Sequence, residues 1–240
     1  MERAPPPRTA PPAPPAGQRQ AWVFGASGLV GRALLDVLLT APEYARITAL
    51  TRRPLGREHP RLANRIVAFD RLEAQLAGVA CQEAFCCLGT TLAQAGSEAA
   101  FRAVDHDTVL RVAGVARRAG AERFVLVSAA GADPAAKNFY LRVKGEAEAA
   151  VAALGFPSLD IVQPGLLLGG ARAESRPLES LGRLVMPLVN PLLGGERKAW
   201  RGMDVAVLAR AMAALPRSGR RGVNRYTWEA LQRLAAKPQR

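Results

Sequence analysis

The stretch Phe24-Gly25-Ala26-Ser27-Gly28-Leu29-Val30-Gly31 decides the fold. It follows an apolar run, Ala21–Phe24, that predicts a buried strand, and it opens an apolar-periodic segment, Leu29–Leu39, that predicts a helix. In this context a Gly-x-x-Gly-x-x-Gly pattern lets the backbone turn tightly and approach a pyrophosphate at the helix N-terminus. An ordinary strand-to-helix turn is the alternative. A nucleoside-triphosphate loop is disfavoured because Arg32, not Lys, follows the last glycine. The stretch therefore predicts a dinucleotide site.

Strands and helices alternate along most of the chain. Apolar segments predict strands over residues 21–25, 45–51, 65–69, 83–88, 123–128 and 159–162. The segments between them predict helices over residues 28–40, 71–77, 97–119 and 139–154. This alternation predicts an α/β fold, a Rossmann-like doubly wound parallel sheet with helices on both of its faces.

The alternation stops after residue 165. Residues 166–200 are rich in Gly, Pro and Leu with a helical stretch near 178–189, and a helix, a short strand and a closing helix are predicted over 204–215, 223–226 and 228–236. We expect residues 21–236 to form one dinucleotide-binding domain, in which 166–236 shapes the substrate pocket. The apolar stretch 181–193 is expected to form a pocket wall or a homodimer contact, with a membrane or another partner as the alternative.

The composition excludes several classes of protein. Residues 1–20 are rich in Pro and Ala and lack an apolar signal core, so we expect a disordered tail and a cytoplasmic location. No apolar run is long enough to span a membrane. The formal charge of +13 comes with only 5% aromatic residues, which favours a solvated basic surface over specific nucleic-acid binding. The spacing of Cys81, Cys86 and Cys87 fits reduced thiols and no metal site.

Two further segments bear on the choice of cofactor. Arg52 and Arg53 follow the second predicted strand, where an acidic residue would bind the ribose hydroxyls of NAD and basic residues accept the 2′-phosphate of NADP. They predict NADP(H), with solvated loop arginines as the alternative. Asp70 ends the third predicted strand, where it can meet the adenine amino group or cap the next helix. Both interpretations of Asp70 stay open.

Three polar residues form a pattern that can carry chemistry. Tyr140 and Lys144 lie one turn apart on one face of a predicted helix, so the lysine is expected to lower the pKa of the phenol and poise it for proton transfer. Ser128 ends the preceding strand, where its hydroxyl can orient a substrate oxygen. Each residue alone occurs by chance on many surfaces. The combination with the glycine turn predicts a catalytic triad of Ser128, Tyr140 and Lys144.

This combination resembles the short-chain dehydrogenase/reductase superfamily, and within it the atypical group that contains the Tat-interacting protein. The resemblance runs from about Trp22 to Pro177 and is most specific in the motifs between Phe85 and Gly165, such as Phe85-Cys-Cys-Leu-Gly-Thr-Thr91 and Asn138-Phe-Tyr-Leu-Arg-Val-Lys-Gly-Glu146. It implies the same triad and a set of cofactor-binding residues: Gly25, Ser27, Gly28, Leu29, Val30, Arg52, Arg53, Asp70, Leu88, Gly89, Thr90, Tyr140, Lys144 and Pro164. The chain departs from its relatives at Ala129 and Ala130, where a serine and a lysine are common.

Together the residues and the resemblance predict an NADPH-dependent oxidoreductase. Hydride would pass to a small carbonyl substrate, with Tyr140 as the acid. The alternative is an NADPH-binding redox sensor or scaffold that acts through a protein partner. Sugar-nucleotide epimerase chemistry on the same triad is disfavoured, because the region after the sixth strand is short for a sugar-nucleotide domain.

Overall fold

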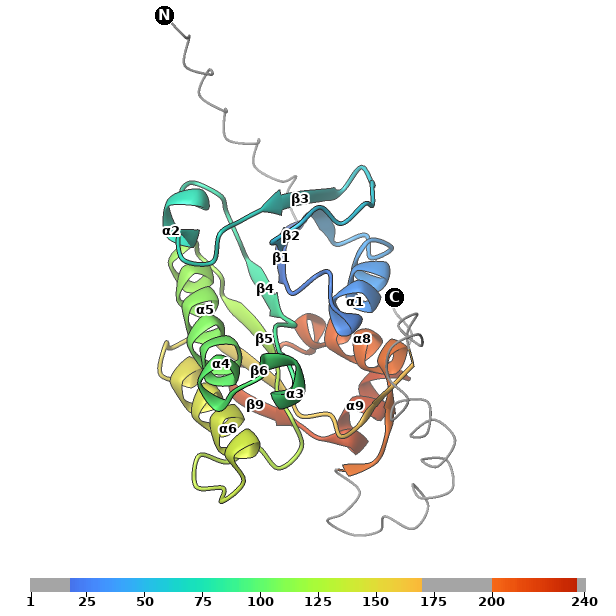
Figure 1. Ribbon diagram of the computed structural model, residues 1–240. Coiled ribbons are helices and arrows are strands. Elements are labelled where there is room, and N and C mark those ends of the chain that lie inside the picture. The colour runs from blue at the N-terminus through green and yellow to red at the C-terminus, as the bar shows by residue number, and fades with distance from the viewer. Residues whose placement is uncertain (1–17, 170–199, 237–240) are drawn as a thin grey trace, which may run out of the picture.

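The computed structural model describes residues 18–169 and 200–236. Its centre is a seven-stranded sheet in the order β3-β2-β1-β4-β5-β6-β9, and every neighbouring pair of strands is parallel. The strands of this sheet are β1 (Arg19–Phe24), β2 (Tyr44–Thr51), β3 (Leu62–Ile66), β4 (Glu83–Cys86), β5 (Arg123–Val127), β6 (Ser158–Val162) and β9 (Gly222–Tyr226). The predicted Rossmann-like doubly wound sheet is thus confirmed (Figure 1).

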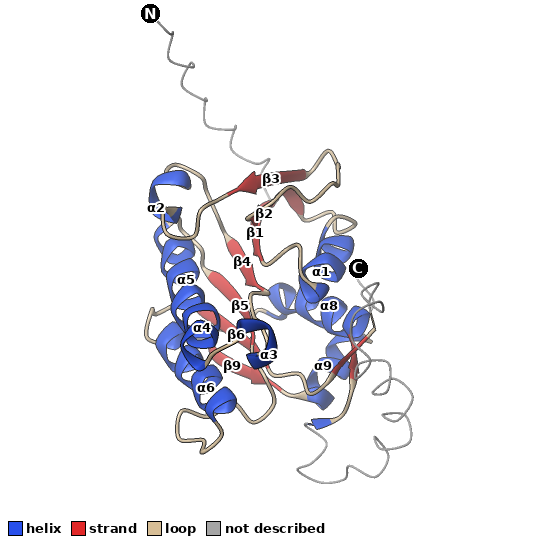
Figure 2. Ribbon diagram, in the orientation of Figure 1, coloured by secondary structure: helices blue, strands red, loops and turns tan. Residues whose placement is uncertain are grey.

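Helices cover both faces of the sheet (Figure 2). One face carries α1 (Leu29–Leu38), α8 (Val205–Ala214) and α9 (Trp228–Ala235). The other carries α2 (Leu72–Gln75), α4 (Glu98–Arg102), α5 (Val109–Arg118) and α6 (Phe139–Ala152). Because side chains of the central strands are buried on both faces, these strands are continuous apolar runs, as in Trp22–Phe24 of β1.

The order of the strands reverses between β1 and β4. From β1 the chain proceeds outward through β2 to β3, and it then returns to β4 and proceeds to the opposite edge. In sheets of this kind, ligands bind outside the carboxyl ends of the strands at the reversal point. The turns after Phe24 and Cys86 lie there, and Cys87 N–H donates to the Phe24 carbonyl at 2.9 Å.

The helix predicted over residues 97–119 is interrupted. Between α4 and α5 lies a π-helical turn, η1 (Ala103–Thr108), which contains Asp105. A π-turn adds a residue to the helical turn and so shifts side chains away from the positions that a 3.6-residue period predicts. The prediction also missed three short elements: α3 (Leu92–Ala95), β7 (Leu167–Leu168) and β8 (Met203–Asp204).

Residues 200–236 pack into the same sheet and core as the residues before 170. β9 extends the sheet beside β6, and α8 packs against α1 and α9 in one apolar core. The helical stretch expected near 178–189 and the apolar stretch 181–193 lie outside the described residues, as do residues 1–17 of the expected tail. The division into a tail, one domain and a pocket-forming part 166–236 stays a prediction.

Candidate active site

A cavity of about 390 Å³ opens at the reversal point of the sheet. It lies at the carboxyl ends of β1, β4, β5 and β6. Most of the predicted site residues line it: Gly28, Leu29, Val30, Leu88, Gly89, Thr90, Ser128, Tyr140, Lys144 and Pro164. The topology therefore brings together residues that are more than a hundred positions apart in the sequence.

Two glycines of the first turn are fixed by packing. Gly25 has a φ of +74°, and a Cβ atom there would come within 2.6 Å of the carbonyl oxygen of Cys87. A Cβ atom on Gly31 would come within 2.2 Å of the carbonyl oxygen of Gly25. Only glycine lets the turn lie against β4 and the helix lie against the turn.

The third glycine leaves the start of α1 open to the cavity. Gly28 is the N-cap of α1, and no side chain caps the helix there. Gly28, Leu29 and Val30 all line the cavity, so the N–H groups and the positive dipole end of the first turn are directed at it. This arrangement fits the pyrophosphate of a dinucleotide. Ser27 is exposed, and its carbonyl accepts a hydrogen bond from Arg32 Nε at 2.9 Å.

The residues predicted for the adenosine end lie outside the cavity. Arg52 and Arg53 are exposed in the loop after β2. The Thr51 hydroxyl stabilises this loop by donating a hydrogen bond to the Arg53 carbonyl at 2.8 Å. Asp70 is exposed and lies 3.9 Å from Arg71 Nε. It is not the N-cap of α2, because that position belongs to Arg71. The roles of these residues toward a cofactor stay predictions.

Ser128 presents a buried hydroxyl without a partner. The residue is 6% exposed, and its backbone N–H donates to the carbonyl of Val162 at 2.8 Å. Its Oγ atom forms no hydrogen bond within the described part of the chain, although the residue lines the cavity. A buried hydroxyl normally has a partner, so Ser128 Oγ is an exception among the polar groups that border the cavity.

Tyr140 lies in the first turn of α6. Asn138 is the N-cap of the helix, and its side chain accepts a hydrogen bond from Leu141 N–H at 3.1 Å. The centre of the Phe101 ring lies 5.3 Å from the centre of the Tyr140 ring. Burial raises the pKa of Tyr140, the charge of Lys144 lowers it, and the charge of Asp105 raises it further. The net pKa is raised. Lys144 thus acts on this pKa in the expected direction, and burial together with Asp105 outweighs it.

Lys144 forms a buried ion pair that the sequence did not predict. Its Nζ atom lies 3.0 Å from Asp105 Oδ1 and 3.4 Å from the Val127 carbonyl. The other carboxylate oxygen of Asp105 accepts the N–H of Thr90 at 2.9 Å. Burial alone would lower the pKa of Lys144, but the neighbouring Asp105 and Tyr140 leave it raised. The ammonium is thus held charged at the floor of the cavity.

Asp105 also lines the cavity, although it is not among the residues predicted from the sequence. One signal in the sequence could have found it, since Phe101, Asp105 and Val109 follow at intervals of four. A carboxylate between two apolar residues on one helix face is buried, and a buried carboxylate needs a partner.

The loops after β4 and β6, which border the cavity, are also held by specific contacts. A Cβ atom on Gly89 would lie 3.3 Å from Asp105 Oδ1, so a side chain at position 89 would crowd the ion pair. Pro164 accepts the N–H of Ala130 through its carbonyl at 2.9 Å. The preceding Gln163 donates through Nε2 to the buried Glu148 at 2.8 Å. These contacts fix the loops after β4 and β6 against α6 and η1.

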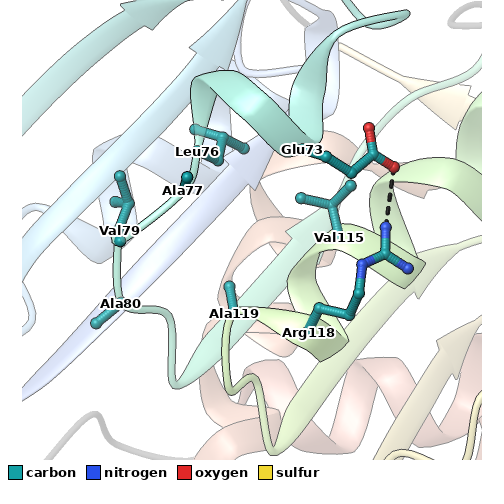
Figure 3. Close-up of a pocket in the computed structure, with 9 residues that line it drawn as sticks. Glu73, Leu76, Ala77, Val79, Ala80, Val115, Arg118 and Ala119 are labelled. Carbon is teal, nitrogen blue, oxygen red and sulfur yellow. Dashed lines mark hydrogen bonds and ion pairs between the residues drawn. The ribbon is translucent and has the colours of Figure 1, made fainter.

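A second hollow of about 360 Å³ lies between α2 and α5 (Figure 3). Its lining is mostly apolar, with residues such as Leu76, Val79 and Val115. Its two charged residues, Glu73 and Arg118, form an ion pair at 2.9 Å. None of the predicted site residues lines this hollow, so it adds nothing to the candidate active site.

Comparison with known proteins identifies the family. Residues 25–182 match the family described as NAD(P)H-binding. The chain belongs to this family. HTATIP2 of Rattus norvegicus is 38% identical over 69% of this chain and 69% of its own length. FMP52 of Coccidioides immitis is 32% identical over 90% of this chain and 92% of its own length. The resemblance to the Tat-interacting-protein group is thereby confirmed.

Solved structures of low sequence identity share the fold. MoeE5 in complex with UDP-glucuronic acid and NAD has a TM-score of 0.67 at 16% identity, covering 86% of this chain and 75% of that one. WbmG of Bordetella bronchiseptica in complex with NAD has a TM-score of 0.64 at 15% identity, covering 89% and 74%. At such identities the likeness extends to the fold alone.

The relatives correct the expected location. FMP52 of Coccidioides immitis and of Aspergillus fumigatus are both named as mitochondrial proteins. The cytoplasmic location expected from the sequence is therefore contradicted. Among the helices of the described residues, none is long and apolar enough to cross a membrane.

Proposed function

We propose that this protein is an NADPH-dependent reductase of a small carbonyl substrate. The observation that carries the proposal is the unpartnered hydroxyl of Ser128, which lines one cavity together with Tyr140, Lys144 and the uncapped start of α1. A donor without a partner, a phenol and an ammonium beside a phosphate-binding turn are the groups that carbonyl reduction requires.

We assign two roles to the proposed site residues, and the first is to hold the cofactor. The first turn of α1, from Gly28 to Val30, binds the pyrophosphate of the cofactor, and Arg52 and Arg53 bind its 2′-phosphate. Leu88, Gly89 and Thr90, which line the cavity, would contact the nicotinamide ribose, and Pro164 would contact the nicotinamide. Gly25, Ser27 and Asp70 complete the proposed cofactor contacts at the turn and at the adenosine end.

The chain supplies the proton and the orientation for reduction. A reduced nicotinamide, when bound, supplies hydride to the carbonyl carbon. Ser128 donates a hydrogen bond to the carbonyl oxygen and so fixes the substrate. Tyr140 donates its phenolic proton to the same oxygen, and Lys144 stabilises the phenolate that remains. Solvent then returns the proton to Tyr140.

Cofactor choice is tested by titration with NADPH and NADH while nicotinamide fluorescence is followed. We expect replacement of both Arg52 and Arg53 by alanine to raise the Kd of NADPH about tenfold or more and to leave that of NADH unchanged. Arg220 and Arg221 give a matched control, because they too are adjacent exposed arginines and lie before β9. Equal effects of the two double substitutions would refute the proposed 2′-phosphate site.

The reaction is tested with a panel of aldehydes and ketones by following NADPH absorbance. We expect Tyr140→Phe to abolish turnover while NADPH still binds. Turnover unaffected by Tyr140→Phe would refute the proposed acid. Binding of NADPH without oxidation across the panel, together with cofactor-dependent capture of a protein partner, would favour the redox sensor instead.

Location and assembly follow from other features. The names of the fungal relatives favour a mitochondrial location for this chain, which fractionation of expressing cells tests. We propose that residues 21–236 act as one domain with 166–236 contributing the substrate side of the pocket, where Leu166 and Leu167 line the cavity. A homodimer is the assembly to be sought by sedimentation.

A further inference from the structure

Asp105 links three elements of the site through one buried carboxylate. It is 1% exposed and lies in the π-helical turn η1. One oxygen binds Lys144 of α6 at 3.0 Å, and the other accepts the N–H of Thr90, in the loop after β4, at 2.9 Å. A carboxylate with both oxygens bound to different elements has a fixed position, and so has the ammonium that it holds.

We propose that Asp105 is a positioning residue that holds Lys144 in place and offsets its charge toward Tyr140, so that the phenol stays protonated over a wider range of pH. The proposal rests on the proposed reductase function. Its physical basis is that a lysine without a counter-charge would stabilise the phenolate of Tyr140 in full. Asp105 offsets that positive charge from 3.0 Å away.

The charged and titratable groups around Tyr140 are few within the described residues. Lys144 lies one turn along the same helix and Asp105 faces it from η1, and the two act on the pKa of the phenol in opposite directions. Behind Lys144, burial raises the pKa of Cys86 on β4 to about 12, so this thiol stays neutral. Elsewhere on α4, η1 and α6, Arg102 pairs with Glu146, Glu148 pairs with Arg225, and His106 Nδ1 lies 2.8 Å from Asp107. Arg142 donates to the carbonyls of Ala136 and Lys137, and Glu98 is exposed in the first turn of α4.

The protonation state of Tyr140 sets the pH range in which it can act as the acid. In reduction the O–H bond of the phenol would break and its proton would form the O–H bond of the alcohol as the C=O π bond opens, while a reduced nicotinamide would supply the hydride from its own C–H bond and be left oxidised. A raised pKa keeps the phenol protonated, and so able to supply this proton, up to a higher pH.

The test compares Asp105→Asn with a matched control, Asp107→Asn. The first substitution keeps the shape of the side chain and an oxygen for Thr90 N–H but removes the charge. Asp107 lies in the same turn and carries the same charge, but its side chain is 61% exposed. Ionisation of Tyr140 is followed by tyrosinate absorbance in the protein without cofactor or substrate, as the difference from the Tyr140→Phe form of each variant.

We expect Asp105→Asn to lower the midpoint of Tyr140 ionisation by about one pH unit or more, and Asp107→Asn to leave it in place. An unchanged or raised midpoint in Asp105→Asn overturns the proposal, as does an equal shift in the control. The readout needs no substrate, so it remains informative even if no carbonyl compound is reduced and the proposed function fails.

A second pair of variants covers the case in which Asp105→Asn does not fold because Lys144 is left buried without a partner. Lys144→Met alone leaves the charge of Asp105 facing Tyr140, whereas Lys144→Met with Asp105→Asn removes both charges. We expect Tyr140 to ionise at lower pH in the double variant than in Lys144→Met. Equal midpoints would show that Asp105 does not act on the phenol.

With an active substrate the same variants predict a shift in the pH profile. We expect the alkaline limb of kcat/KM for reduction to move to lower pH in Asp105→Asn. A residue with only a structural role would lower the rate without moving the limb. That result would overturn the proposal.

Discussion

Replacing Ser128 by alanine should make the protein more stable and a poorer catalyst. Ser128 is 6% exposed, and its Oγ atom has no hydrogen-bond partner among the described residues. Burying an unpaired hydroxyl costs about 1–3 kcal/mol. Alanine keeps the Cβ atom and removes only this group, so we expect the free energy of unfolding to rise by about 1 kcal/mol. For a chain of this size the melting temperature would rise by about 2–4 °C.

Ser158 provides the matched control at the opposite end of the sheet. It is 3% exposed and begins β6. Its hydroxyl accepts from Arg123 at 2.8 Å and donates to Asp160 at 3.3 Å. Ser158→Ala removes the same atom and with it these two hydrogen bonds between buried groups, while Arg123 and Asp160 keep their ion pair at 3.0 Å. We therefore expect it to lower the free energy of unfolding by about 1–3 kcal/mol.

Urea unfolding and steady-state reduction together give the decisive comparison. A hydrogen bond to the carbonyl oxygen in the transition state is worth about 1.5–3 kcal/mol, so Ser128→Ala should lower kcat/KM about 10- to 100-fold. Ser158→Ala should leave kcat/KM of the folded protein nearly unchanged. If Ser128→Ala destabilises the protein as Ser158→Ala does, the hydroxyl has a structural partner and the argument for its role toward substrate is refuted.

Two further substitutions test the turn and the core. Gly31→Ala places a Cβ atom 2.2 Å from the carbonyl oxygen of Gly25 and should lower the free energy of unfolding in urea by about 1–3 kcal/mol or more. The control is Gly114→Ala inside α5, where the new Cβ atom meets only the flexible side chain of Arg118 and should raise the free energy of unfolding by about 0.5–1 kcal/mol. Equal effects of the two substitutions would contradict the tight packing of the turn. Tyr226 has a pKa raised to about 12 by burial and by Asp160, so the folded state retains this proton at pH values where the unfolded chain loses it. The stabilisation from this difference is fully present below about pH 10 and is lost as the pH rises through the pKa of the folded state. Between about pH 9 and 11 the free energy of unfolding of the wild type should therefore fall by about 1 kcal/mol more than that of Tyr226→Phe. A parallel dependence on pH in the two proteins would contradict this.

The sequence specified the scaffold of the site well because its signals are local. The first strand, the glycine turn and helix α1 follow from an apolar run, three glycines and a helical period within about twenty residues. The parallel, doubly wound class of the sheet follows from the repeated alternation of strands and helices, since parallel neighbours require crossover connections. The carboxyl ends of four strands then meet at one cavity, which is why most of the predicted site residues lie together.

The electrostatics of the site could not be predicted because they depend on contacts that are distant in the sequence. The spacing of Tyr140 and Lys144 gave the sign of one interaction correctly, since the lysine lowers the pKa of the phenol. Burial and Asp105 act in the opposite direction and prevail. Asp105 reaches the site through a π-turn, and its partner lies 39 residues further along the chain. The four-residue spacing of Phe101, Asp105 and Val109 indicates that Asp105 is buried, but it does not identify the partner.

Buried carboxylates also occur away from the cavity, and their partners distinguish them from Asp105. Glu83 at the start of β4 accepts a hydrogen bond from Tyr44 at 2.6 Å and pairs with Arg19. Asp160 in β6 is held by Arg123 and Tyr226, each at 3.0 Å. In both cases an arginine and a phenol share the charge, and neither carboxylate lines the cavity. These pairs serve the packing of the sheet.

Lys144 is a different kind of partner, because an ammonium has three donors arranged around one atom. Two of them donate to Asp105 Oδ1 at 3.0 Å and to the Val127 carbonyl at 3.4 Å. Because Lys144 also lines the cavity, the third donor is left for a hydroxyl of a bound ligand, and the two fixed contacts set its direction. An arginine here would satisfy Asp105 with two of its N–H groups and fill the space that the ligand needs. We therefore expect Lys144→Arg to retain the ion pair and the folded state but to weaken NADPH binding, and unchanged binding in a fluorescence titration would show that no ligand hydroxyl depends on this donor.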